Sequence, residues 1–130
     1  LRVWHEDLPI EILNYIEEIG FNVGTYNANL TAQHPGQMTS LHRDNYLYLA
    51  KEFDVTPEEL IRFWIPLTDW DRGQIFGVED VCFTKWESGN CYTFDSDKWH
   101  WAVNAGYSIR YTLLVTALKN NVGNVIDGKS

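Results

Sequence analysis

The sequence predicts an all-β fold of jelly-roll type, a sandwich or barrel of short strands with one helix packed against its outside. Three observations support this fold class. One amphipathic stretch stands near the N-terminus, about eight short segments rich in aromatic and β-branched residues follow it, and Gly, Pro, Asn and Asp separate these segments. One helix beside many short strands is typical of sheets that close on themselves. The 130 residues fit a single domain, 1–130, with a loosely held tail at 121–130.

The helix is expected over residues 8–19. Its apolar side chains, Ile12 and Ile16 among them, recur at the spacing of one helical face. Pro9 suits a first helical turn, and Gly20 is a natural stop. The apolar face should pack against the sheet.

The strands follow the helix and are bounded by turn residues. We expect them at 21–30, 37–42, 60–67, 74–78, 81–85, 90–94, 100–104 and 107–118. Residues 86–89 indicate the turn of a hairpin. The pattern of residues 45–53 fits either a helix or an ordered loop. Residues 56–59 predict a single capped helical turn.

The last strand has two different faces. Its alternate side chains form one mixed face, Arg110, Thr112, Leu114 and Thr116, and one apolar face, Tyr111, Leu113, Val115 and Ala117. We expect the apolar face to pack against the protein and the mixed face to line a cavity.

Charge and composition exclude two classes of function. Eighteen acidic residues against ten scattered basic ones give a net charge of -8, so no basic stripe exists to follow a nucleic acid backbone. The longest apolar runs, such as 64–67, fall far short of the roughly 18 residues of a membrane-spanning helix. Neither nucleic acid nor a membrane is therefore an expected partner.

The two cysteines, Cys82 and Cys91, are too few for the disulfide framework of a small secreted domain. We therefore expect a reducing, cytoplasmic setting. A disulfide bridge between them across the predicted hairpin is an alternative, but two buried thiols are favoured.

A metal site is indicated by His42 and Asp44. In an extended strand these two side chains point to the same side, while Arg43 points away. The best third ligand is His100, at the start of a predicted strand. Two histidines and one carboxylate on one face of a metal are typical of non-haem Fe(II) oxygenases. Taken alone, the pair also fits a surface hydrogen bond.

An anion site is indicated by Arg110, ten positions after His100, and by Thr112 on the same strand face. A buried guanidinium is unfavourable unless an anion meets it. The fork with a hydroxyl beside it suits the distal carboxylate of a dicarboxylate. An internal salt bridge is the alternative.

Together these residues resemble the motif of the Fe(II)/2-oxoglutarate-dependent oxygenase superfamily: His-x-Asp, a distant His, then Arg-x-Ser/Thr. Here the motif is His42-Arg43-Asp44, His100 and Arg110-Tyr111-Thr112. The similarity extends over residues 26–118 to short single-domain oxygenases of marine bacteria and their phages, and its further stretches are 35–37, 62–70, 86–89 and 99–104.

The resemblance implies a double-stranded β-helix of the cupin-like type, with Fe(II), 2-oxoglutarate as cosubstrate, and O2. His42, Asp44 and His100 would ligate iron, and Arg110 and Thr112 would hold the C5 carboxylate of 2-oxoglutarate. The expected reaction is hydroxylation of a peptide side chain or a small metabolite, with release of succinate and CO2.

Tyr26, Gln37, Trp64 and Asn104 lie where the family often places cosubstrate or substrate contacts. We favour core filling or backbone hydrogen bonding for these four. His34 would replace His100 if the latter bound no metal.

Two other functions use the same residues. A non-catalytic, metal-binding cupin-like module requires neither Arg110 nor Thr112. A zinc hydrolase would use the same three ligands with an activated water, but no general base is evident for it.

Overall fold

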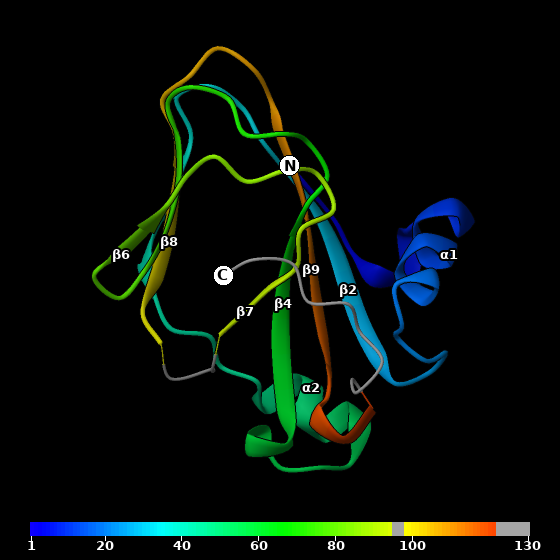
Figure 1. Cartoon of the computed structure of the whole chain (residues 1–130). Helices are drawn as coiled ribbons and strands as arrows, with labels where there is room; N and C mark the ends of the chain where they lie inside the picture. Colours follow the sequence, from blue (N-terminus) through cyan, green and yellow to red (C-terminus); the bar gives the residue numbers. More distant parts are fainter. Residues whose placement is uncertain (95–97, 122–130) are drawn as a thin grey trace.

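The computed structural model describes residues 1–94 and 98–121, and it confirms an all-β core with the N-terminal helix outside (Figure 1). In chain order the elements are β1 Arg2–Val3, η1 His5–Asp7, α1 Ile10–Glu18, β2 Tyr26–Gln33, β3 Met38–His42, α2 Leu47–Phe53, η2 Pro57–Glu59, β4 Leu60–Pro66, β5 Gln74–Val78, β6 Val81–Phe83, β7 Tyr92–Phe94, β8 His100–Asn104, β9 Arg110–Leu118 and η3 Lys119–Asn121.

The strands form two antiparallel sheets. The larger sheet has the order β1-β2-β9-β4-β7 and the smaller one the order β3-β8-β5-β6. Figure 1 shows the smaller sheet on the left and the larger sheet at the centre, with α1 against the far side of β2 and α2 at the lower end. Residues of both sheets line the cavity described below.

The register of the larger sheet sorts its side chains into two faces. Leu113 stands opposite Leu30 on β2 and Ile65 on β4, so all three point to one side. This side packs against α1, whose Ile16 is fully buried in the same apolar cluster. The predicted apolar face of the last strand is thus the one that the helix covers, although Tyr111 at its end is 39% exposed.

Leu113→Ala is expected to destabilise the fold by about 2–5 kcal/mol, because the fully buried side chain leaves a cavity between helix and sheet. Tyr111→Ala on the same strand should have a much smaller effect, since that side chain is partly exposed. Urea unfolding of both variants measures the difference. Equal losses of stability would mean that α1 does not pack as described.

Aromatic side chains fill part of the space between the two sheets. Trp64 of β4 stacks on Phe76 of β5 at 4.4 Å between ring centroids, and Trp86 meets Trp64 edge-on at 4.9 Å. This cluster joins the sheets with apolar contacts. At its edge the lining becomes polar, and there the cavity described below begins.

The predicted strands differ from the structure most at two ends, and the strands expected at 81–85 and 90–94 are each two residues shorter, Val81–Phe83 and Tyr92–Phe94. The strand expected at 21–30 starts at Tyr26, because a turn closed by the Thr25 amide and the Asn22 carbonyl (3.1 Å) precedes it, and it runs on to Gln33. The strand expected from residue 107 starts at Arg110. Residues 45–53, left open above, contain α2, and the capped turn before β4 is present as η2.

The hairpin predicted at residues 86–89 is wrong. The strands before and after it, β6 and β7, belong to different sheets. The segment is held instead to the end of β4, where the Gly89 amide donates to the Pro66 carbonyl at 2.8 Å. Neither cysteine forms a disulfide bond; Cys91 is buried as expected, but Cys82 is exposed.

No helix in the described part of the chain is long and apolar enough to cross a membrane. The tail expected to be loosely held, apart from Asn121 at the end of η3, lies outside the described residues.

Candidate active site

A bulge in β3 brings the two candidate histidine ligands together. Met38 and Thr39 pair with Val103 and Ala102, but His42 pairs with His100, so one extra residue is accommodated before it. Without that shift Leu41 would stand opposite His100, and His42 would point to the other side of the sheet. The bulge thus places both imidazoles on one side, with ring centroids 4.2 Å apart.

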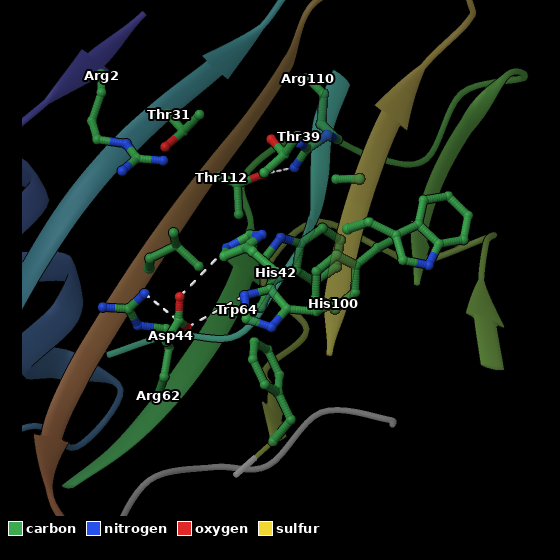
Figure 2. A pocket seen from close by; sticks show the side chains of 15 residues that line it. Arg2, Thr31, Thr39, His42, Asp44, Arg62, Trp64, His100, Arg110 and Thr112 are labelled. Carbon is green, nitrogen blue, oxygen red and sulfur yellow. Dashed lines mark hydrogen bonds and ion pairs between the residues drawn. The ribbon is translucent and has the colours of Figure 1, made fainter. Parts of the chain in front are cut away.

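Asp44 completes the cluster from the loop after β3. Its Oδ1 lies 3.5 Å from His42 Nε2, and its Oδ2 lies 3.3 Å from His100 Nε2. The three ligand atoms lie within 4.8 Å of one another, and Figure 2 shows the two rings and the carboxylate converging. The chain therefore brings the predicted His-x-Asp pair and the distant His to a single point.

The protein fixes the orientation of both imidazoles through their Nδ1 atoms. His42 Nδ1 lies 2.7 Å from the Ser40 carbonyl, and His100 Nδ1 lies 3.1 Å from the Lys98 carbonyl. Because a carbonyl can only accept, each Nδ1 must carry the proton. In the neutral rings the Nε2 lone pairs then face the carboxylate, which is how metal-binding histidines are usually held.

Arg62 of β4 holds the carboxylate from the other side, with Nη1 3.0 Å from Asp44 Oδ2. Burial alone would raise the pKa of Asp44, but its close contact with His100 and the charge of Arg62 outweigh it and lower the pKa below its ordinary value. The side chain is therefore an anion at neutral pH. Arg62 is itself positioned by Nε, which donates to Thr116 Oγ1 at 2.9 Å.

The donor set fits a divalent metal ion. Asp44 Oδ2 is buried and makes no well-formed hydrogen bond, although Arg62 Nη1 and His100 Nε2 lie beside it at 3.0 and 3.3 Å. Neighbouring ligands on a metal with bonds of about 2.1 Å lie roughly 3 Å apart, close to the separations between the carboxylate and the two Nε2 atoms. Two histidines and one carboxylate leave further coordination positions free.

Arg110 lies in the same cavity and is 3% exposed. Gln33 Oε1 accepts hydrogen bonds from its Nε and Nη2 at 3.1 and 2.7 Å, and Thr112 Oγ1 accepts from its Nη1. No carboxylate pairs with it among the described residues, so the alternative of an internal salt bridge does not apply there. Burial lowers the pKa of Arg110 to about 10, which leaves the guanidinium charged at neutral pH.

These groups share one cavity of about 90 Å³ between the sheets (Figure 2). The mixed face of β9 forms one wall, as the sequence predicts, because Arg110, Thr112 and Leu114 all line it. The facing wall comes from β3, β8 and β5. A small, partly aromatic cavity with a cationic end and a metal-type cluster can hold a small anion that also reaches the metal position.

Of the other predicted contacts, only Trp64 reaches this cavity, where its ring lies 5.7 Å from the Arg110 guanidinium carbon. Tyr26 points to the α1 side and donates to Glu17 Oε2 at 2.9 Å, because it shares a face with Ala117. Asn104 is fully buried but holds the backbone, donating to the carbonyls of Gln33 and Ser108 at 2.9 and 2.8 Å. Tyr26 and Asn104 therefore do not line this cavity, and their contacts agree with the core-filling and backbone-binding roles favoured from the sequence.

The remaining candidate residues make hydrogen bonds within their own segments or at the sheet edge, away from the cavity. Gln37 Oε1 accepts from the His34 amide at 2.8 Å in an exposed turn. His5 Nδ1 accepts from the Ala28 amide at 3.0 Å, so it holds the sheet edge. Neither His34 nor His5 lies in the candidate cluster.

Five polar residues at this site are not among the sequence predictions: Arg2, Thr31, Gln33, Thr39 and Arg62. Arg62 could have been found, since it is two positions before Trp64 and shares its strand face. Gln33 stands opposite Arg110 and Arg2 opposite Thr31, but these pairings depend on contacts between distant segments. The sequence pattern around Gln33 and Arg2 does not predict these pairings.

Comparison with known proteins gives one family match. The model of the family described as Aspartyl/Asparaginyl beta-hydroxylase matches residues 9–120, which include all three candidate ligands, Arg110 and Thr112. No curated protein matches the chain significantly.

Solved structures similar to the chain have cupin and related folds. A predicted oxalate decarboxylase from Thermotoga maritima has a TM-score of 0.54 at 15% identity, over 90% of this chain and 78% of that one. The cupin domain of Cnp3 from Schizosaccharomyces pombe has a TM-score of 0.52 at 9% identity, over 76% of this chain and 57% of that one. KdgF from a Halomonas species has a TM-score of 0.52 at 9% identity, over 75% and 73%. At these identities the likeness shows the double-stranded β-helix fold alone.

Proposed function

Because the chain belongs to the aspartyl/asparaginyl beta-hydroxylase family, we propose that it is an Fe(II)- and 2-oxoglutarate-dependent dioxygenase that hydroxylates a peptide side chain or a small metabolite. The observation that carries this proposal is the pairing of two features in one cavity. A cluster with the donors of a facial metal site, His42, Asp44 and His100, faces a space that also contains Arg110, a buried guanidinium with no carboxylate partner among the described residues.

Fe(II), 2-oxoglutarate and O2 would supply the oxidising power for hydroxylation, with release of succinate and CO2. His42, Asp44 and His100 would hold the metal. Their geometry is set before a metal binds, because two backbone carbonyls fix the rings and Arg62 fixes the carboxylate.

Arg110 and Thr112 would hold the C5 carboxylate of the cosubstrate. Because β9 carries both residues on the cavity face, an anion bound there is directed toward the histidines of the opposite sheet. Gln33 keeps the guanidinium in place, since its single oxygen accepts from two of the guanidinium nitrogens. The aromatic rings of Trp64, Phe76 and Phe94 in the wall limit the entry of water.

The proposal is tested by titrating the Fe(II)-loaded protein with 2-oxoglutarate without oxygen, and then admitting air. We expect a visible charge-transfer band during the titration and succinate after exposure to air. A protein that binds metal but gives neither signal would be a non-catalytic, metal-binding cupin-like module. Hydrolytic activity supported by Zn(II) would instead indicate the zinc hydrolase.

Gln33→Glu is expected to raise the KM for 2-oxoglutarate by about tenfold or more, because the new carboxylate would pair with Arg110 and compete with the cosubstrate. The variant should remain folded, since a buried charge gains a partner. Steady-state succinate formation measures the KM, and thermal unfolding measures the stability.

Gln37→Glu makes the same change of charge in an exposed turn and is the matched control. We expect it to leave the KM within about twofold, because a surface charge is screened by solvent. Similar KM values for the Gln33 variant and the wild type would separate Arg110 from cosubstrate binding.

A further inference from the structure

Positive charge is concentrated in the cavity of an otherwise acidic chain. The net charge is -8, and the arginines are Arg2, Arg43, Arg62, Arg72 and Arg110. Arg2, Arg62 and Arg110 all line the one cavity, as Figure 2 shows, and among the described residues of its wall Asp44 is the single carboxylate. This clustering is a property of the cavity and does not follow from the composition.

Two of the three guanidiniums already have partners. Arg62 pairs with Asp44, and Arg110 is assigned to the C5 carboxylate under the proposed function. Arg2 makes no ion pair with any described acidic residue, and its guanidinium carbon lies over the ring of Trp4, 5.3 Å from the ring centroid. Burial and the charge of Arg62 lower the pKa of Arg2, while Asp44 raises it, so its charge is incompletely balanced in the free protein.

Arg2 stands where the cavity meets the surface. It is opposite Thr31 in the pairing of β1 with β2, and Thr39 of β3 lies across the gap between the sheets. These three residues also line a surface groove of about 360 Å³ beside the edge of β3. A molecule entering from this groove would meet the Arg2 guanidinium before it reached the metal position.

Charge also argues for an anion at this point. With a divalent metal at His42, Asp44 and His100, and a 2-oxoglutarate dianion on Arg110, the described residues that line the cavity would still give it a net positive charge. A third cation near the first two is stabilised only when an anion joins it. Moreover, Arg2 lies outside residues 9–120, so the family match assigns it no role.

We propose that the primary substrate carries an oxyanion group, a carboxylate, phosphate or sulfate, and that Arg2 binds this group with the hydroxyls of Thr31 and Thr39 beside it. Arg2 is then a specificity-determining residue, and neutral analogues of the substrate are poor substrates. This inference rests on the proposed function for the identity of the ligand on Arg110, but the test below separates the two.

The test uses the Zn(II)-loaded protein with N-oxalylglycine, a non-reacting analogue of 2-oxoglutarate, to fill the Arg110 site. Acetate, sulfate and neutral acetamide are titrated while the arginine side-chain Nε–H signals are followed by 15N NMR. We expect a saturable shift of the Arg2 signal with acetate, with sulfate or with both, and none with acetamide. The anion that shifts the Arg2 signal at the lower concentration, acetate or sulfate, indicates which class of oxyanion the site prefers.

The variants make the assignment specific. Arg2→Gln should weaken anion binding, measured by tryptophan fluorescence or calorimetry, by about tenfold or more, the effect of losing one charge-assisted hydrogen bond. Arg2→Lys should retain part of the affinity. Arg72→Gln removes an exposed arginine outside the cavity and should have no effect.

Three results would overturn the inference: equal binding of acetamide, equal losses in the Arg2 and Arg72 variants, or a loss of N-oxalylglycine affinity in Arg2→Gln as large as that in Arg110→Ala. The last would show that Arg2 anchors the cosubstrate. Failure of the wild type to bind N-oxalylglycine would instead contradict the proposed function, and the same anion titrations with Zn(II) alone would still decide the role of Arg2.

Discussion

The His100→Ala variant is expected to bind Fe(II) more than about 100-fold more weakly than the wild type, because loss of a ligand should exceed the usual effect of losing a residue that only supports one. Succinate formation should fall to background. His100 is 7% exposed, pairs with His42 across the sheet and lies 3.3 Å from Asp44, and no other histidine, cysteine or acidic residue in the described part of the chain belongs to this cluster. Anaerobic Mn(II) titration followed by electron paramagnetic resonance measures metal affinity without the complication of oxidation.

His34→Ala is the matched control, since this histidine is exposed in the turn before β3 and lies outside the cluster. It should bind Mn(II) as the wild type does. Far-UV circular dichroism of the His100 variant must be unchanged for the comparison to hold. Retained affinity in a folded His100 variant, with a loss in His34→Ala, would move the metal site to the residue that we considered as its replacement.

Much of the smaller sheet could be predicted from the sequence because its strands are short and sharply bounded. β5 and β8 have the bounds expected from their turn residues, and His100 begins β8 as predicted. His42 and Asp44 lie close together, as the two-residue period of an extended chain predicts, although β3 ends at His42 and Asp44 belongs to the following loop. The candidate ligands could therefore be named before their geometry was known.

The relation between distant segments could not be predicted in the same way. Residues 86–89 have the composition of a hairpin turn, but local composition does not determine which sheet the next strand joins, and β7 pairs with β4. The bulge before His42 cannot be predicted from the sequence for the same reason, since it is defined by the pairing of β3 with β8. Tyr26 illustrates the consequence for the site: its side of the sheet is set by its register with β9, and that side faces α1.

The Arg110→Ala variant is expected to raise the KM for 2-oxoglutarate by about 100-fold or more while the protein still binds metal. The buried guanidinium would make two charge-assisted hydrogen bonds to the C5 carboxylate, each contributing about 1.5–3 kcal/mol. Arg110→Lys keeps the charge but not the planar fork, so its KM should lie between those of the wild type and the alanine variant. Steady-state succinate assays give the KM values, and Mn(II) titration gives the metal affinity.

Stability and cosubstrate binding should separate in this variant, and that separation distinguishes a binding residue from a structural one. In the free protein Arg110 has neutral partners, Gln33 and Thr112, so burial of its charge is not offset by a described carboxylate. Its removal should therefore change the free energy of unfolding far less than it changes the free energy of cosubstrate binding, which the KM reports. Arg72→Ala, which removes an exposed arginine outside the cavity, controls for the lost charge. An Arg110 variant that unfolds easily but keeps its affinity for 2-oxoglutarate would show that the guanidinium serves the fold, and the cosubstrate would then need another anchor.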